Sequence, residues 1–111
     1  MHRLFPQKLL TIVTHDVLEE RLVEMVRRRG ASGYTVDKVS GAGSSGEVSG
    51  ELDVDTSIKF QVIVPQGRMS GMLDDVEAMT GEGHHFTVFV SDVAVLAPQQ
   101  SEIPVDDSTA R

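Results

Sequence analysis

Apolar residues follow a strand-like pattern in four short segments of the chain, and these segments predict four β-strands. The first, Lys8–Val13, is a run of Leu and β-branched residues that is typical of a central strand. The other three are Tyr34–Val39, Ile58–Val64 and Phe86–Leu96, and the last has the strongest β signal of the chain. Alternation is clearest in Ile58–Val64, where every second residue from Ile58 is apolar. We therefore expect that strand to have one buried face.

A different period, with apolar residues every three or four positions, predicts a helix after the first strand. Asp16 and Glu19 have the spacing of a capping box, so the helix is expected to start at Val17. Gly30 is expected to end it, just after Arg27–Arg29, whose charges suit the C-terminal end of a helix. The predicted apolar stripe consists of Leu18, Leu22, Met25 and Val26.

The same period predicts a second helix over Met69–Met79, with Asp74 and Asp75 in its solvated first turn and Gly81 as its stop. The order of elements is then β-α-β-β-α-β. This is the ferredoxin-like arrangement of the α+β class, with one antiparallel sheet and both helices on one face. The opposite face is left open, and apolar side chains on it favour self-association. The residues expected there are Leu9, Val62, Val88 and Val90 or their neighbours.

A long loop rich in glycine and hydroxyl residues connects the second and third predicted strands. It covers the 18 residues 40–57, whereas most hairpin loops have about 2 to 5 residues. Taken alone, such a loop is more often a flexible connection than a binding site. We expect one domain over residues 1–97, in which the loop is flexible at about residues 44–56. Residues 98–111 have no apolar period and are expected to form a mobile tail.

Composition and charge exclude several classes of function. The net charge is −7, from 17 acidic and 10 basic residues, and non-specific nucleic-acid binding needs a clustered basic surface instead. The absence of cysteine rules out disulfides and thiol nucleophiles and suits a reducing cytoplasm. No apolar run approaches the roughly 18 residues of a membrane span. No local catalytic pattern is present either, so we do not expect an enzyme.

Residues 33–43, Gly-Tyr-Thr-Val-Asp-Lys-Val-Ser-Gly-Ala-Gly, resemble the Gly-x-Thr-Val-x-x-x-x-Gly-x-Gly signature of the PII signalling family. The segment Thr80-Gly-Glu-Gly83 is similar to the turn that leads into the last strand of that family. The resemblance covers nearly the whole ordered chain. It implies a homotrimer that binds adenine nucleotides in clefts between subunits. It also implies that a partner protein reads the ordering of the long loop between the second and third strands, the T-loop.

The resemblance assigns roles to individual residues. Thr35 matches the threonine that contacts the adenine, with Ile63 expected beside it, and Gly41 and Gly43 match the glycines that wrap the phosphates. Without the flanking Gly-x-Gly pattern, Thr35 would be read as an ordinary strand residue. The turn before the last strand is expected to complete the nucleotide site with Gly83, His84, His85, Phe86 and Thr87, although Phe86 also suits the core. His84 and His85 are adjacent, which argues against their binding one metal ion.

The chain also departs from the usual pattern of the family. Ser44 and Ser45 replace an Arg-Gln pair, the loop is shorter and lacks the modified tyrosine, and Thr87 falls near the position of a phosphate-binding lysine. The two arginines expected beyond the last strand are missing. With three cations lost, ADP or AMP is favoured over ATP as the ligand. The 2-oxoglutarate response of the family is not expected.

The segments GASGYTV and IKFQV are similar to the branch of the family linked to inorganic carbon, namely SbtB-like regulators and carboxysome-associated PII proteins. This resemblance implies bicarbonate as a second ligand, held by Lys59, Ser44 and Ser45, and no prosthetic group. It further implies a cytoplasmic protein, with association to carboxysomes as an option. Two alternatives remain on the sequence: a trimeric metal-binding or structural protein of the CutA kind and, more weakly, a small ferredoxin-like enzyme subunit.

Overall fold

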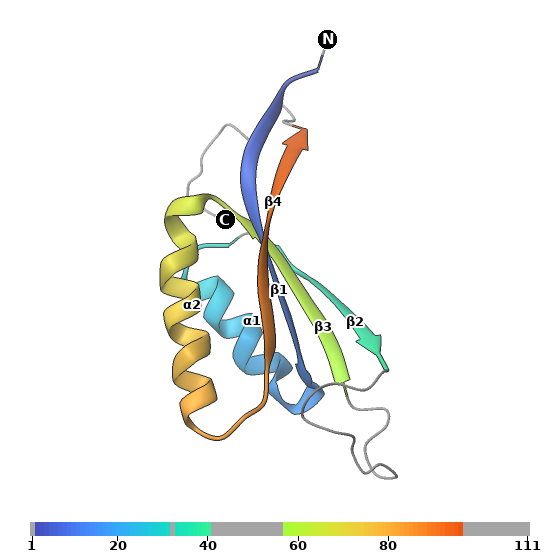
Figure 1. Cartoon of the computed structure of the whole chain (residues 1–111), viewed down its shortest axis with the longest axis vertical. Coiled ribbons are helices and arrows are strands. Elements are labelled where there is room, and N and C mark those ends of the chain that lie inside the picture. The colour runs from blue at the N-terminus through green and yellow to red at the C-terminus, as the bar shows by residue number, and fades with distance from the viewer. Residues whose placement is uncertain (1, 32, 41–56, 97–111) are drawn as a thin grey trace.

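The computed structural model describes residues 2–31, 33–40 and 57–96. Four strands form one antiparallel sheet in the order β2-β3-β1-β4, and two helices pack against one of its faces (Figure 1). The predicted ferredoxin-like arrangement is therefore confirmed. In chain order the elements are β1 (Leu4–His15), the 3₁₀ turn η1 (Asp16–Leu18), α1 (Glu19–Arg28), β2 (Thr35–Val39), β3 (Ser57–Val64), α2 (Gln66–Gly81) and β4 (Thr87–Leu96).

The start of the first helix differs from the capping-box prediction. Residues Asp16–Leu18 form a 3₁₀ turn, and the α-helix begins at Glu19. No side-chain cap hydrogen bond is made at either the 3₁₀ turn or α1, so the predicted role of Asp16 as an N-cap is wrong. At the other end the prediction is correct, because Gly30 has a φ of 90° and ends the helix.

The second helix is longer than its apolar period indicates. It begins at Gln66 and includes Gly81, which was predicted to stop it. The left-handed turn lies two residues later, at Gly83, whose φ is 102°. Asp74 and Asp75 are consequently in the middle of α2, and the prediction of a solvated first turn is wrong for them. The carboxylate of Asp75 accepts two hydrogen bonds of 2.9 Å from Arg29.

This ion pair joins the C-terminal end of α1 to the middle of α2. Arg28 adds a second contact of 3.6 Å to the same carboxylate, and the side chain of Arg68 donates to the backbone carbonyl of Arg29 at 2.7 Å. The hydrogen bonds from Arg29 are the main cause that lowers the pKa of Asp75, with the charges of both arginines adding to the effect. The arginines at the end of α1 therefore have a structural role.

The core lies between the sheet and the two helices. In β3 the side chains at Ile58, Phe60, Val62 and Val64 are buried, which confirms the predicted alternation. The ring of Tyr34 stacks on that of Phe60 with their centroids 5.2 Å apart. Burial of one large apolar side chain stabilises the fold by about 1.5–3 kcal/mol relative to leaving it exposed. The rest of the core comes from Leu10, Ile12, Leu22, Met25, Val26, Met69, Met72, Val76 and Met79.

The open face of the sheet carries a different set of residues from the one predicted. Directly opposed residues of antiparallel strands point to the same face. Leu10 of β1 faces Val62 of β3 and Val90 of β4. Because Leu10 is in the core, both valines point toward the helices, and the same argument through Ile12 applies to Val88. Only Leu9 was placed correctly. The open face instead presents Leu9, Val13, Ile63, Phe89, Val93 and Val95, together with polar side chains.

The predicted flexible loop (44–56) and the predicted tail (98–111) lie outside the described residues.

Candidate nucleotide and anion site

A row of four side chains crosses the open face from the β2 edge to the β4 edge. Thr35, the first residue of β2, is exposed and lies opposite Gln61 of β3. Gln61 in turn lies opposite Thr11 of β1, and its Nε2 donates to the Thr11 hydroxyl at 3.1 Å. Phe89 of β4 completes the row. The predicted adenine-contacting threonine thus lies in the same row as a Gln61–Thr11 hydrogen bond at the centre of the sheet.

The next row toward the β2–β3 loop contains Lys59. It lies between Asp37 of β2 and Val13 of β1, and Thr87 of β4 lies on the far side of Val13. Opposed side chains in such a pair have Cβ atoms about 4.5–5.5 Å apart, so Asp37 and Lys59 project side by side from the same face. Lys59 is half-buried. An anion that reaches this row therefore meets the ammonium group of Lys59, which has an acidic residue opposite it on β2 and an apolar one opposite it on β1.

Ile63 lies on the opposite side of the first row from Lys59. It faces Leu9 across the β1–β3 pair, and 49% of its surface is exposed although it is apolar. Ile63 is two positions after Gln61 along β3, so it is on the same face and diagonal to Thr35. An exposed aliphatic side chain next to a hydroxyl suits the face and the edge of a flat heterocycle. Three of the predicted site residues, Thr35, Lys59 and Ile63, are brought together here.

The turn after α2 is fixed by contacts with α1. Arg21 donates two hydrogen bonds, of 2.7 and 3.2 Å, to the carboxylate of Glu82, and these bonds are the main cause that lowers the pKa of Glu82. Nε2 of His84 lies 3.6 Å from the same carboxylate. The ring of His84 also meets Phe86 edge-on at 6.4 Å, and Phe86 packs against the core. Because the Phe86 side chain packs against the core, a ligand can contact this residue mainly through its backbone groups.

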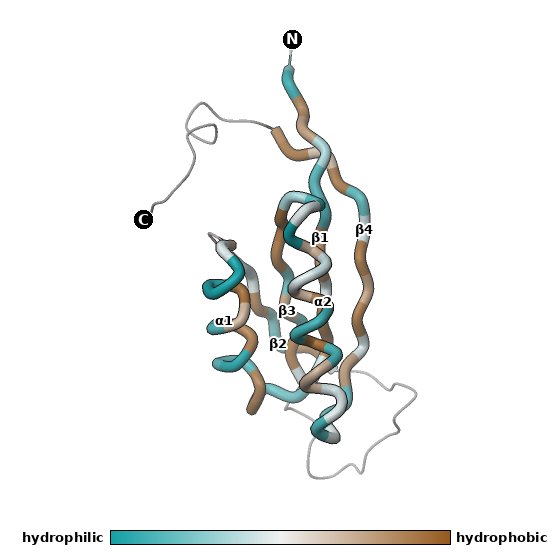
Figure 2. Tube along the Cα trace, turned by 90° about the vertical axis from the view of Figure 1, so that its left-hand side faces the viewer, coloured by the Kyte–Doolittle hydropathy of each residue, from teal (hydrophilic) through white to brown (hydrophobic). Residues whose placement is uncertain are grey.

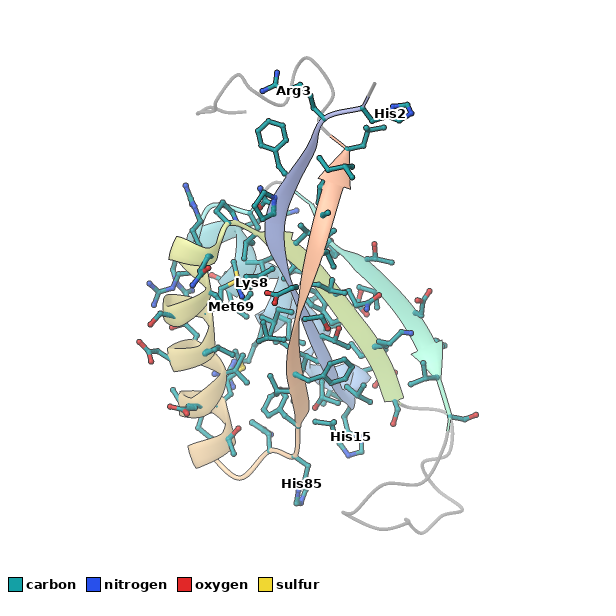
Figure 3. The ribbon with its side chains drawn as sticks, turned by 45° about the horizontal axis from the view of Figure 1, so that its top comes forward. His2, Arg3, Lys8, His15, Met69 and His85 are labelled. Carbon is teal, nitrogen blue, oxygen red and sulfur yellow. The ribbon has the colours of Figure 1, made fainter. Side chains whose placement is uncertain are left out.

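A hydrogen bond from β1 holds the second half of this turn. The Thr14 hydroxyl donates to the backbone carbonyl of His85 at 2.7 Å. His15 and His85 lie at the same end of the molecule, where β1 ends and β4 is about to begin (Figure 3). Thr87 follows as the first residue of β4 and points to the open face through its pairing with Val13. The turn of residues 83–87 therefore borders the Lys59 row across β1.

Not all of the predicted site is within reach of the structure. Gly41, Gly43, Ser44 and Ser45 lie outside the described residues. Three residues that shape the site were missed from the sequence: Gln61, Asp37 and Thr14. Gln61 and Asp37 are recognised only once β2 is paired with β3 in register, and Thr14 only through its contact with a turn 71 residues away.

Two other kinds of feature are absent from the described part of the chain. It contains no group of three or more His, Cys, Asp or Glu side chains that could hold a metal ion. Neither α1 nor α2 combines the length and the apolar character that a membrane-spanning helix requires.

The family model of the nitrogen regulatory protein P-II matches residues 7–100. The chain belongs to this family. The predicted resemblance is confirmed, and membership in a family of regulatory signalling proteins removes the support for a protein of the CutA kind. The turn of residues 83–87 and the three β2–β3 residues described above all fall within the matched range, as does the whole β2–β3 loop.

Solved structures of similar proteins agree with this P-II assignment. CPII, a nitrogen regulatory PII-like protein from Thiomonas intermedia K12, bound to ADP, AMP and bicarbonate, is 30% identical with a TM-score of 0.78 over 90% of this chain and 97% of that chain. The same protein bound to ADP and bicarbonate is 31% identical, with a TM-score of 0.78 over 90% and 98%. A protein from Thermus thermophilus, assigned to PII-like signaling, is 32% identical, with a TM-score of 0.71 over 89% and 96%. The bicarbonate-bound structures support the carbon-linked branch of the family.

Proposed function

We propose that this P-II protein is a homotrimeric sensor that binds ADP or AMP together with bicarbonate and so links adenylate state to inorganic carbon. The observation that carries the proposal is the gathering of Thr35, Ile63 and Lys59 on one sheet face, in a chain whose similar structures hold ADP and bicarbonate. It acts in the cytoplasm, with carboxysome association as one setting. A target protein, reading the β2–β3 loop, receives the signal.

In this proposal each residue has a distinct task. The Thr35 hydroxyl bonds to the edge of the adenine, and Ile63 covers part of its face. Lys59 supplies a positive charge to bicarbonate, while backbone N–H groups of the Gly/Ser loop from Gly41 to Ser45 surround the anions, as such loops do without many side chains. The turn at residues 83–87 closes the phosphate side. Because Asp37 lies beside Lys59, the anion must compete with a carboxylate. We therefore expect moderate bicarbonate affinity that responds to its concentration.

The trimer supplies what one subunit lacks. Phe89 and Ile63 are about half exposed on the open face, next to Leu9 and Val93. An apolar sheet face of this kind marks an interaction surface. Packing three open faces around an axis covers these side chains and places the β2 edge of one subunit beside another subunit. The nucleotide then binds in the cleft between them.

Calorimetric titration with ADP and AMP, each with and without bicarbonate, tests the proposal. We expect nucleotide binding that becomes tighter when bicarbonate is present. Lys59→Ala should abolish this coupling while leaving some nucleotide binding. The matched control is Lys38→Ala, because Lys38 lies opposite Ile58 and so points away from the open face. Loss of coupling in both variants, or in neither, would contradict the assigned role of Lys59. No binding of either nucleotide would refute the function itself.

A second variant tests the adenine contact. Thr35→Val keeps the shape of the side chain and removes its hydroxyl. One hydrogen bond has a net value of about 0.5–1.5 kcal/mol, which corresponds to a loss of roughly 2- to 12-fold in affinity. The loss should be equal for ADP and AMP, because both share the adenine. If Thr35→Val weakens the binding of ADP and AMP to different extents, Thr35 lies near the phosphates instead.

A further inference from the structure

The sheet carries a projecting two-stranded arm. β1 pairs with β3 only from Lys8 to His15, whereas it pairs with β4 as far as Leu4, opposite Leu96. Within the described residues, 4–7 and 93–96 thus form a ribbon without a third strand, which we call the arm. It extends past the N-terminal end of α2 (Figures 1 and 2). Four residues of strand correspond to a reach of about 13 Å.

Both faces of the arm are largely apolar. By the register, Leu4, Pro6, Ala94 and Leu96 share the helix side, and Phe5, Val93 and Val95 share the open side with Gln7. Leu4 and Leu96 are 59% and 58% exposed. A ribbon of two strands is marginally stable in water by itself. Packing of the open faces covers only one side of the arm, so the helix side requires a second cover.

A groove at the base of the arm has the matching chemistry. It has a volume of about 450 Å³ and lies between the first half of α2 and the strands β1 and β4. Met69, Leu73 and Val90 make its apolar lining. Its rim is polar, with Lys8 and Asp74 among the lining residues, and Lys8 is held by an ion pair with Asp92. Figure 3 shows Lys8 and Met69 near each other beside α2.

We propose that the arm of one subunit docks in this groove on a neighbouring copy of the chain. The helix-side leucines would enter the apolar lining. Arg3 at the tip lies with its guanidinium over the Phe5 ring at 5.2 Å, on the open side of the arm, so it leaves the helix-side leucines uncovered. An arm cannot reach the groove of its own chain, because its strands lead away from Lys8. The contact is heterologous, and three such contacts close a ring.

This inference rests on the proposed trimer and adds to it the location of a second interface. Cross-linking tests it directly, because the chain has no cysteine. We expect the double variant Leu4→Cys, Leu73→Cys to form disulfide-linked dimers and trimers under mild oxidation, seen on a non-reducing gel. The control pair is Leu4→Cys with Val17→Cys, since Val17 is exposed on η1, away from the groove. This pair should stay uncross-linked.

The outcomes separate the two proposals. A trimer by light scattering that gives no Leu4–Leu73 cross-link overturns the docking of the arm and leaves the trimer intact. A monomer overturns both. Cross-linking of the control pair to the same extent also overturns the docking, because the bond would then report chance collisions. Nucleotide binding is measured separately, because it tests the proposed function and not the docking of the arm.

Discussion

Replacing Thr14 with valine tests whether β1 holds the turn that borders the candidate site. Only 5% of the Thr14 surface is exposed, and its hydroxyl donates to the carbonyl of His85 at 2.7 Å. Valine has nearly the same shape, so packing is retained and the hydrogen bond alone is lost. The His85 carbonyl then has no side-chain donor from β1. The substitution therefore isolates one tether between the first strand and the turn.

The expected loss follows from the burial of the two groups. Leaving a buried acceptor unsatisfied costs about 1–3 kcal/mol. His85 is an exposed residue, so water can partly replace the lost donor, and the lower half of that range applies. For a domain of about 100 residues each kcal/mol lowers the melting temperature by roughly 4–8 °C. We expect Thr14→Val to lower the free energy of unfolding by about 1–2 kcal/mol and the melting temperature by about 4–16 °C.

Urea unfolding and calorimetry measure both quantities. The matched control is Thr80→Val, whose hydroxyl bonds only to the helical carbonyl of Val76 at 3.1 Å. Its removal should change the unfolding free energy by less than about 0.5 kcal/mol. Thr14→Ser, which keeps the hydroxyl, should recover part of the loss and weaken ADP binding less than the valine variant. Equal losses from Thr14→Val and Thr80→Val would refute the reasoning.

Two other predictions concern the helices. Because the pKa of Asp75 is lowered in the folded chain, its stabilising effect is present above the unfolded value of 3.8 and is lost as the pH falls through the lower folded pKa. Asp75→Asn should therefore lower the free energy of unfolding at pH 7, by more than Asp74→Asn does. In strong acid the stability of Asp75→Asn should converge with that of the native chain, and urea unfolding measures all three. Gly30→Ala places a side chain at a φ of 90° and against the guanidinium of Arg68, so it should lose about 1–2 kcal/mol. Gly67→Ala, with nothing near its added methyl group, should leave the stability unchanged or raise it by up to about 1 kcal/mol. Thermal unfolding measures both variants, and a larger loss for Gly67→Ala than for Gly30→Ala would contradict this prediction.

The order of the elements was predictable because the periods of the sequence are clean. Every second residue from Ile58 is buried as expected. Apolar residues at every third or fourth position identified both helices. The extension of β1 was missed because Pro6 interrupts the apolar run. At the position of Pro6, β1 has a partner on one side only among the described strands. Proline is tolerated there because fewer ladder hydrogen bonds are required of it.

The buried face of each strand and the register between strands were harder to predict from the sequence than the type of each element. Val62 and Val90 were assigned to the open face, yet both oppose Leu10 and point to the helices. Alternation separates the two faces of a strand but does not say which face the helices cover. The pairing of Thr35 with Gln61 joins strands separated by a long loop. It is set by tertiary packing, and no local pattern in either strand specifies it.

The strand order also governs how the chain reaches this state. β1 is synthesised first but lies between β3 and β4. Val90, the cross-strand neighbour of Leu10 on β4, is synthesised 80 residues after Leu10. Contacts this distant in sequence make folding slow, because the entropy of loop closure is lost before the contacts form. During synthesis the apolar first strand stays without its final partner until β4 leaves the ribosome. Nascent chains of this P-II protein are therefore exposed to off-pathway association, and holdase chaperones should bind translation intermediates that end before residue 87 more strongly than the completed protein.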